Sequence, residues 1–343
     1  MSRHAKKRSI CEESELGMNV RGEVMTDWEG HYRAHRNFLV SYAFRMTGSL
    51  ADAEDIVQDT VSECLKFDPA VIKNHRAWMT RICANKSLDL LKSSARRKNK
   101  YIGTWLPDAI PETLNTELLR GIDVAADAKV ELSESLAMSF LILLQTLSPV
   151  ERSIFLLKDI FDYSFKEVSE LVGKSEVACR KIAERARKSM TGHGRIIRQT
   201  SPDSEAMIGQ FFEAAKLGDR ALLMALLSEK SEFLTDGGGK APAAPPMIGI
   251  PGQIADFFLA SSIPTMFKSS NFRLEAQRVN AGPGFVISKQ GPDGMWSFES
   301  IISFEIAANK IARIYAQRNP DKLNSILKMV GRDPRLFGSK KIA

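Results

Sequence analysis

The sequence has few of the residues that metal sites and thiol chemistry require. Four cysteines are scattered along 343 residues without CxxC spacing, at Cys11, Cys64, Cys83 and Cys179. All five histidines and all four cysteines lie at or before His193. This pattern argues against a zinc site or a disulfide framework and predicts a reducing compartment. It also leaves the residues after His193 without imidazole or thiol groups for ligation or catalysis.

Long apolar runs are missing as well. No stretch approaches the roughly 20 residues of a membrane-spanning helix. The first segment, "MSRHAKKRSICEESELG", is charged and has no apolar core, so it does not have the pattern of a secretory signal. We therefore expect a flexible N-terminal tail, a cytoplasmic protein, and no membrane partner, metal or cofactor.

The chain also lacks a complete phosphate-binding loop, although "TDGGGKAPAAPP" (235–246) resembles one at first sight. The Walker pattern needs glycine where this chain has Leu234, and Ser or Thr where it has Ala241. Three glycines permit positive φ and close approach to another surface, and the alanine–proline run stiffens the exit. The segment is therefore either an ordinary mobile loop or a protein contact, with Asp236 and Lys240 as its charged groups.

What the chain does have is an excess of positive charge, +7 by count, which suggests a polyanionic partner. Two segments of linker composition separate two helical stretches, and alternating, strand-like segments follow the second linker. Near the start of this last part we expect two short helices and a further helix over 251–268. The predicted limits are a tail (1–25), a helical domain (26–102), a linker (103–129), a second helical domain (130–192), a second linker (193–204) and an α+β domain (205–343).

The helix in "SLADAEDIVQDTVSECLKF" is amphipathic. One face carries Ala53, Val57, Val61 and Cys64, and another carries Asp52, Asp55 and Asp59. The pattern fits a plain surface helix or an acidic docking face.

The next helix, in "AWMTRICANKSLDLLKSSARRKNKY", carries a polar stripe. Its members lie within about 80° on a helical wheel: Arg81, Asn85, Asp89, Lys92 and Arg96. A solvated charged face would show the same stripe, but the uncompensated positive charge at the helix end favours contact with DNA. Trp78 and Tyr101 flank the stripe and could stack on unpaired bases, although Trp78 fits the core equally well.

The segment "YSFKEVSELVGKSEVACRKIAERARKSM" has helix-turn-helix spacing, with a glycine turn at Gly173. In its second helix the predicted inner side is Ala178, Cys179, Ile182, Ala183, Ala186 and Met190. The predicted outer side is Val177, Arg180, Lys181, Glu184, Arg187 and Lys188. Such an outer face can read guanine edges and thymine methyl groups. A generic helical hairpin shares the periodicity but less often combines a glycine turn with a cation cluster.

Together the three segments resemble the extracytoplasmic-function sigma factors of bacterial RNA polymerase. The resemblance spans roughly 30–190 and rests on "FRMTGSLADAEDIVQDTV", "AWMTRICANKSLDLLKSSARR" and "LSPVERSIFLLKDIFDYSFKEVSELVGKSEVACRKIAERARKSM". It implies that the first helical domain is sigma region 2 and the second is sigma region 4.

The resemblance also implies three sets of contact residues. The core-polymerase docking set is Asp52, Asp55, Gln58 and Asp59. The minus-ten set is Lys73, Asn74, Arg76, Trp78, Arg81, Asn85, Lys92, Arg96 and Arg97. The minus-thirty-five set is Ser175, Val177, Arg180, Lys181, Arg185, Arg187 and Lys188.

The last part resembles the subgroup with a SnoaL-like extension, a cone-shaped α+β fold. Its signatures are "WLPD" (Trp105, Leu106, Pro107 and the following aspartate), "DGGGK" (Asp236, Gly237, Gly238, Gly239, Lys240) and "NPDKL" (Asn319, Pro320, Asp321, Lys322, Leu323). The family tends to have Glu-Pro after "WLP", where this chain has "DAIPE", which puts local linker contacts in doubt. The resemblance implies that the extension replaces a separate anti-sigma factor and acts by intramolecular contact with the sigma domains.

The predicted partners are core RNA polymerase and promoter DNA, and the predicted fold is two all-α sigma domains followed by an α+β cone. Two alternatives are a stand-alone helix-turn-helix regulator with a ligand-sensing domain and a SnoaL-like enzyme. A repressor usually carries one helix-turn-helix and binds a palindrome as a dimer, whereas this chain has two distinct basic surfaces. The last domain has no histidine for catalysis, so we expect no enzyme. Five aromatic residues either line a ligand cavity or form its core: Phe257, Phe258, Phe285, Trp296 and Phe304.

Overall fold

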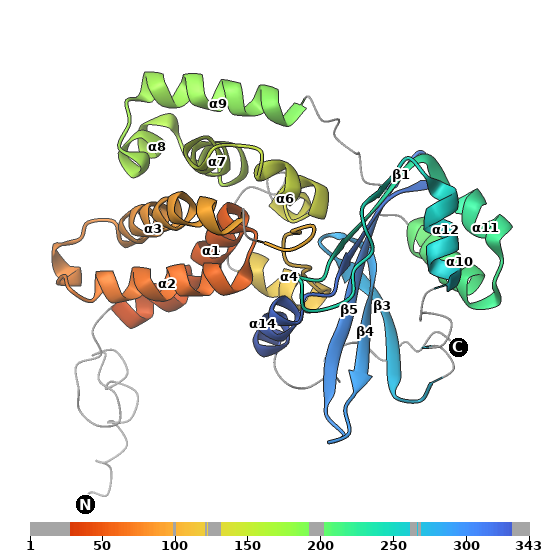
Figure 1. Ribbon diagram of the computed structural model, residues 1–343. Coiled ribbons are helices and arrows are strands. Elements are labelled where there is room, and N and C mark those ends of the chain that lie inside the picture. Colours follow the sequence, from red (N-terminus) through yellow and green to blue (C-terminus); the bar gives the residue numbers. More distant parts are fainter. Residues whose placement is uncertain are drawn as a thin grey trace, which may run out of the picture.

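The protein is described from a computed structural model, which places residues 28–98, 101–120, 122, 132–191, 202–260, 266 and 269–330. The predicted tail (1–25) and most of the second linker lie outside these residues. Figure 1 shows a stack of helices on one side and, on the other, a sheet that is covered on both faces by helices.

Region 2 consists of α1 (Trp28–Thr47), α2 (Leu50–Cys64), a 3-10 turn η2 (Pro69–Val71) and α3 (His75–Lys98). Helix α2 begins where the Ser49 side chain accepts a hydrogen bond from the Asp52 backbone N–H at 3.2 Å, a standard N-cap. The apolar face predicted for α2 is confirmed. Ala53, Val57 and Cys64 are buried, and Val61 packs against the core.

The predicted linker contains a helix that the composition did not indicate, α4 (Glu112–Leu119). Leu114 and Leu118 lie one turn apart and are buried, which anchors this short helix. The sequence pattern did not indicate this helix, because two prolines and the acidic bias of the segment outweigh that pair.

Region 4 contains α6 (Met138–Leu144), α7 (Pro149–Phe155), a π-helical turn η3 (Leu156–Ile160), α8 (Phe165–Val172) and α9 (Glu176–Thr191). Capping boxes start α7 at Ser148 and α8 at Ser164. Gly173 ends α8 with φ of 66°, so the chain turns and α9 begins three residues later. The predicted helix-turn-helix is confirmed.

The C-terminal domain starts with two helices, α10 (Pro202–Leu217) and α11 (Arg220–Leu226). Its further elements are β1 (Leu227–Asp236), β2 (Met247–Ile248), α12 (Pro251–Ala260), β3 (Phe272–Val279), β4 (Gly282–Gln290), β5 (Trp296–Ala307), β6 (Lys310–Gln317) and α14 (Pro320–Val330). The strand order is β2-β1-β6-β5-β4-β3, with β1 and β6 parallel and the other pairs antiparallel. Strand β1 was not among the predicted strands.

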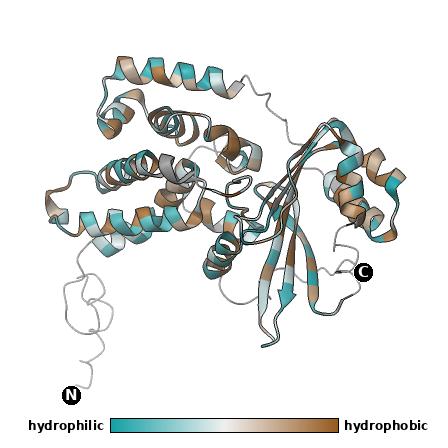
Figure 2. Cartoon of the chain, viewed as in Figure 1, coloured by the Kyte–Doolittle hydropathy of each residue, from teal (hydrophilic) through white to brown (hydrophobic). Residues whose placement is uncertain are grey.

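The sheet buries both of its faces, and Figure 2 shows apolar residues along its strands. Side chains alternate between the two faces of a strand. Ile302 and Phe304 of β5 face α10, α11 and α12 and belong to a core of this domain alone. Ile301, the residue before Ile302, belongs to the core that also fills regions 2 and 4, as does Tyr315 of β6. The C-terminal domain therefore shares a hydrophobic core with the sigma regions.

Most of the aromatic residues considered for a cavity pack against one another. The ring of Phe212 lies 4.1 Å from that of Phe285 and 5.9 Å from that of Phe304. Phe233 lies 5.2 Å from Phe258. Trp296 differs, because it is only partly buried and has the Arg273 guanidinium 3.9 Å from its ring. No helix in the described ranges is long and apolar enough to cross a membrane.

Candidate nucleic-acid interfaces and linker junction

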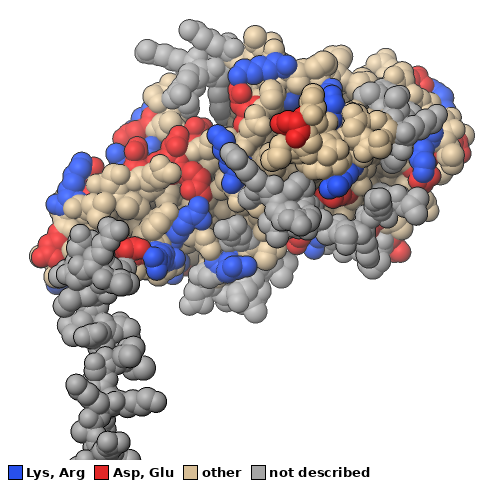
Figure 3. Space-filling model, turned by 90° about the horizontal axis from the view of Figure 1, so that it is seen from below, with Lys and Arg blue, Asp and Glu red and all other residues tan. Residues whose placement is uncertain are grey.

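The acidic face of α2 is open to solvent. Asp55, Gln58 and Asp59 are exposed, and Asp52 is half-buried near the N-cap. Figure 3 shows acidic and basic side chains interspersed over the end of the molecule from which the N-terminal trace leaves. The geometry thus leaves the predicted docking set accessible to a partner.

The minus-ten set does not form one uniform surface. Arg81 and Asn85 are exposed on α3. Arg76 is instead held between two aromatic rings, with its guanidinium 4.8 Å from Phe38 and 5.7 Å from Tyr163.

Trp78 is partly buried and meets the Phe67 ring edge-to-face at 5.3 Å. The Asn74 side chain accepts the Ala77 backbone N–H at 2.9 Å and so caps α3. Lys92 pairs with Asp89. The side chains of Arg96 and Arg97 lie outside the described residues.

A cleft of about 940 Å³ lies between α3 and region 4. One wall carries five residues of the minus-ten set: Lys73, Asn74, Arg76, Trp78 and Arg81. The other wall carries carboxylates from region 4, on Asp162, Glu167 and Glu170. Acidic groups of region 4 therefore face the basic side of α3.

The outer face of α9 is accessible, and its inner face is confirmed as buried around Cys179, Ala183 and Ala186. Val177 is 63% exposed. The Arg180 guanidinium lies 4.6 Å from the centre of the Phe165 ring, at the start of α8.

The other members of the minus-thirty-five set differ in their contacts. Lys181 and Arg185 are exposed. Ser175 accepts the Ala178 backbone N–H at 3.2 Å, so its hydroxyl caps α9. Arg187 pairs with Asp159 at 2.8 Å, and Lys188 pairs with Glu184 at 2.9 Å.

The three signatures "WLPD", "DGGGK" and "NPDKL" meet at one place, which we call the linker junction. At its centre is Asp236, which is fully buried at the end of β1. One carboxylate oxygen accepts the Tyr101 hydroxyl at 2.6 Å and the Gly238 backbone N–H at 3.0 Å. The other accepts the Leu106 backbone N–H at 3.1 Å and the Lys322 ammonium at 2.9 Å. A single side chain thus joins the linker, the glycine loop and α14.

Lys322 is the cation of the junction. Its ammonium group donates to the Leu106 carbonyl, lies 4.5 Å from the Trp105 ring and is 3.7 Å from the Asp108 carboxylate. Asp108 in turn accepts the Leu50 backbone N–H at 2.7 Å at the start of α2. Region 2, the linker and the C-terminal domain therefore converge on this lysine.

The glycines are needed for close approach. Gly238 has φ of 61°, and a Cβ on it would collide with the Asn319 side chain. A Cβ on Gly239 would lie 2.9 Å from Ile102 of the linker. Lys240 does not reach the sigma domains or their linker; it pairs with Asp321 at 2.6 Å, within the C-terminal domain.

A second contact joins the sheet to the start of region 4. Asn280 donates to the Leu136 carbonyl at 3.1 Å and accepts the Ile110 backbone N–H at 3.0 Å. Glu305 accepts the Ser139 backbone N–H at 2.9 Å, in the first turn of α6.

Sequence reasoning missed several of these residues. Tyr101 was placed beside the α3 stripe as a stacking group, which was wrong, because its hydroxyl is bonded to Asp236 and Asn319. No local sequence pattern identified Asn280 or Glu305 as contact residues. Asn280 has φ of 49°, and the "NAGPG" turn was the one pattern that could have drawn attention to it.

Comparisons with known proteins agree with this arrangement. Sigma-70 region 2 matches residues 31–97, and Sigma-70 region 4 matches residues 138–190. The chain therefore contains segments similar to both of these sigma-70 regions, in the same order.

Relatives narrow the class further. The ECF RNA polymerase sigma factor SigJ of Mycobacterium tuberculosis is 32% identical over 299 residues, covering 85% of this chain and 91% of SigJ. The crystal structure of that protein matches with a TM-score of 0.64 at 30% identity, over 87% of this chain and 98% of the SigJ chain. The probable ECF sigma factor SigI of the same species is 31% identical over 200 residues, 57% of this chain and 65% of SigI. The chain belongs to the extracytoplasmic-function sigma factors, and its C-terminal part is an α+β domain.

The junction predicts an unusual pH dependence of stability. Burial raises the pKa of Asp108 to about 6, against the opposing effects of Lys322 and the Leu50 N–H. The folded state therefore binds this proton more tightly than the unfolded state, and stability rises as pH falls through about 6. Lowering the pH from about 7.5 to about 5 should raise the free energy of unfolding by about 1 kcal/mol.

Asp108→Asn should not show this increase of about 1 kcal/mol in the free energy of unfolding. The measurement is urea unfolding at both pH values. Asp293→Asn, on an exposed turn, controls for the loss of a carboxylate. A pH dependence in Asp108→Asn identical to that of the unaltered chain would contradict the assignment.

Proposed function

We propose that this protein is an alternative sigma factor whose C-terminal domain restrains it by holding the linker between regions 2 and 4. In this role it binds core RNA polymerase through α2, reads the minus-ten element with α3 and its preceding loop, and reads the minus-thirty-five element with α9. Such a protein works in the cytoplasm. The observation that carries the restraint is the set of bonds from Asp236 and Lys322 to the linker backbone at Leu106.

The physical argument concerns which surfaces are available. The acidic face of α2 and the outer face of α9 are exposed, so polymerase and the upstream element can reach them. The segment from Tyr101 to Pro111, which contains the start of the linker, is instead held along the C-terminal domain, by Asp236 at one end and by a strand-like pairing of Pro111 with Val279 at the other. A polymerase that needs the linker must therefore compete with the C-terminal domain for it.

A holding role suits the C-terminal domain better than a catalytic one. Four of the five aromatic residues considered for a cavity belong to the core of the C-terminal domain or pack against it, and Trp296 is covered by Arg273. The most buried carboxylates, Asp236 and Asp108, are engaged by linker and α2 backbone groups rather than facing a substrate space.

Core binding is tested at α2. Asp55→Lys with Asp59→Lys reverses two exposed charges and should weaken assembly with core polymerase about tenfold or more, since a complementary surface would then be repelled. The measurement is titration of labelled core enzyme, followed by transcription from a cognate promoter. The control of equal charge change is Glu229→Lys with Asp293→Lys, which reverses two exposed carboxylates of the C-terminal domain. Normal assembly by the α2 variant would exclude this docking face.

Upstream recognition is tested at α9. Arg180→Ala with Lys181→Ala removes two exposed cations and should lose discrimination at the minus-thirty-five element, since each good base contact contributes about 1–3 kcal/mol. Footprinting of the holoenzyme on matched and mutated promoters measures the ratio. Lys230→Ala with Lys289→Ala, which removes two exposed cations of the C-terminal domain, is the control. An unchanged sequence preference would remove α9 from this role.

Restraint is tested at the junction. Asp236→Asn and Lys322→Met each weaken charge-assisted bonds to the linker, of which each contributes about 1.5–3 kcal/mol. Transcription with core polymerase should rise several-fold in both variants. Lys240→Ala lies in the same loop region but does not contact the linker, so it should match the unaltered protein. Transcription that stays constant or falls in folded Asp236→Asn would refute the restraint.

A further inference from the structure

The cleft between α3 and region 4 contains two buried N–H groups that have no acceptor among the described residues. They are the indole Nε1–H of Trp78 and the guanidinium Nε–H of Arg76, and both side chains line the cleft. The indole N–H of Trp28, in contrast, donates to the Phe67 carbonyl at 2.8 Å. Because a buried donor without an acceptor is costly, a pair of them in one cleft indicates a missing binding partner.

Other buried nitrogens without an acceptor, within the described ranges, lie in a different setting. They are the Nε atoms of Arg152 and Arg278, and neither residue lines the cleft. Arg152 donates through its other guanidinium nitrogens to the Met46 and Leu147 carbonyls. The Nε of Arg278 is 3.8 Å from the Glu112 carboxylate. The two donors of the cleft therefore differ from these in lining a common open space.

We infer that this cleft is a binding site for a guanine nucleotide, a ligand that combines phosphate groups with a planar base. The inference goes beyond the proposed function, because it requires the folded chain alone and not promoter recognition. The cleft volume of about 940 Å³ lies within the usual range of small-molecule sites, about 300–1,000 Å³.

The α3 wall fits the phosphate end of such a ligand. Lys73, Arg76 and Arg81 line this wall and carry three positive charges. The Arg76 guanidinium lies 4.8 Å from the Phe38 ring and 5.7 Å from the Tyr163 ring, so its position is fixed before a ligand arrives. Phosphate oxygens are strong acceptors for charged and neutral N–H groups. They would supply the acceptors that the two buried donors lack.

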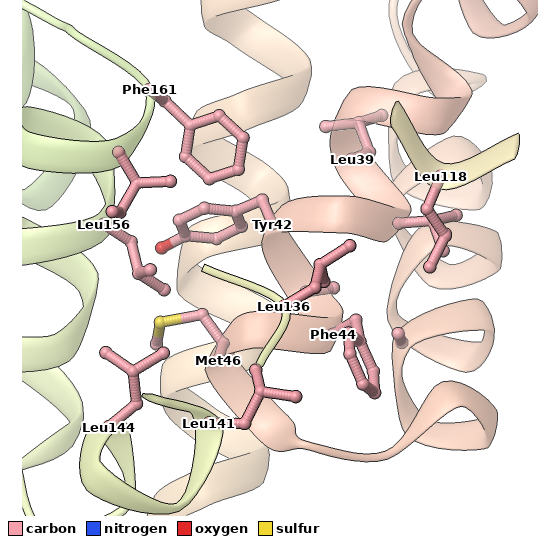
Figure 4. Close-up of a cluster of buried hydrophobic side chains, with 14 of the residues drawn as sticks. Leu39, Tyr42, Phe44, Met46, Leu118, Leu136, Leu141, Leu144, Leu156 and Phe161 are labelled. Carbon is pink, nitrogen blue, oxygen red and sulfur yellow. The ribbon is translucent and has the colours of Figure 1, made fainter. Parts of the chain in front are cut away.

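Aromatic rings provide a surface for the base. Trp78, Phe161 and Tyr163 line the cleft. The Trp78 ring meets Phe67 edge-to-face at 5.3 Å. Phe161 lies beside Tyr42 of α1, with 6.1 Å between the ring centres, as Figure 4 shows. Rings that are held by their neighbours can stack on a planar base with little further loss of side-chain freedom.

The region 4 wall selects among bases, because it carries carboxylates. Glu167 already accepts the Ser164 backbone N–H and hydroxyl, and Asp162 pairs with Lys158. The exposed Glu170 is therefore the carboxylate that a ligand could engage. A carboxylate accepts two parallel N–H bonds, and guanine presents such a pair on one edge, whereas uracil presents a single N–H. Since carboxylates repel phosphate, the ligand would enter with its phosphates toward α3.

Occupation of the cleft has a consequence for the minus-ten set. Lys73, Arg76 and Trp78 would contact the nucleotide, so a melted DNA strand could not use them at the same time. A bound nucleotide would therefore compete with promoter DNA. This consequence rests on the proposed function, whereas the site itself does not.

The test is isothermal titration calorimetry of the full chain with four probes, guanosine diphosphate (GDP), uridine diphosphate (UDP), guanosine and pyrophosphate. GDP should bind with a dissociation constant below about 0.1 mM, and each other probe at least about tenfold more weakly, because each lacks one recognised part. Failure of GDP to bind at about 1 mM would overturn the site. Binding of any other probe as tightly as GDP would overturn its assignment to a guanine nucleotide.

A spectroscopic measurement locates the ligand. The indole N–H resonance of Trp78 in nuclear magnetic resonance spectra is assigned by its absence in Trp78→Phe. It should move downfield when GDP is added, since this N–H gains an acceptor. The Trp28 resonance should stay in place, because its N–H already donates to Phe67. A Trp78 resonance that does not move at saturating GDP would place the ligand elsewhere and overturn the site.

Two exposed positions test the walls separately. Lys73→Ala should weaken GDP binding about tenfold, since a charged contact to phosphate is lost. Lys166→Ala, exposed on α8 and outside the lining of the cleft, is its matched control and should bind GDP normally. Glu170→Gln should lower the preference for GDP over UDP about tenfold. Unchanged affinity in Lys73→Ala, or unchanged preference in Glu170→Gln, would overturn the assignment.

These measurements use the chain without polymerase, so they separate the site from the proposed function. Their failure would overturn the nucleotide site and leave the sigma-factor function standing. Absence of transcription by the unaltered protein with core polymerase would instead count against the proposed function, while binding of GDP in the cleft would still uphold the site.

Discussion

A buried carboxylate with four donors organises the contact between the three parts of this protein. Asp236 has no exposed surface, and a buried charge is tolerated only where hydrogen bonds and a counter-ion replace water. Tyr101, Leu106, Gly238 and Lys322 supply them from the linker, the glycine loop and α14. Removal of any one part would leave that charge poorly solvated, which is why linker and C-terminal domain behave as a unit.

The short-range features of the fold could be predicted from sequence. The start of α8 at Ser164, the turn at Gly173 and the buried face of α9 depend on residues within one or two turns of one another. Tyr101 could not be placed in this way, because its partner Asp236 is 135 residues away. Tyr101 was placed beside the DNA stripe only because it is close to α3 in the chain.

The candidate surfaces were predicted unevenly for the same reason. The exposure of Asp55 and Asp59 follows from the periodicity of α2 alone. Arg76 belongs to an equally basic pattern but lies under Tyr163, and only the packing of region 4 on region 2 reveals this. Lys240 adjoins the junction in sequence yet pairs with Asp321, because the glycine turn directs it toward α14. Periodicity identifies a face but not what covers it.

The parallel pairing of β1 and β6 has a consequence for how the junction tolerates change. Asp236 ends β1 and pairs in register with Gln317, which ends β6 two residues before Asn319. The glycine loop and the start of α14 therefore leave the sheet side by side, at positions fixed by the lengths of two strands. Deleting one residue from either strand would shift its end by about 3.3 Å and turn the following side chains to the opposite face. The lengths of the two strands thus set the relative positions of the residues in the junction. An insertion in one strand could be compensated only by a matching insertion in the other.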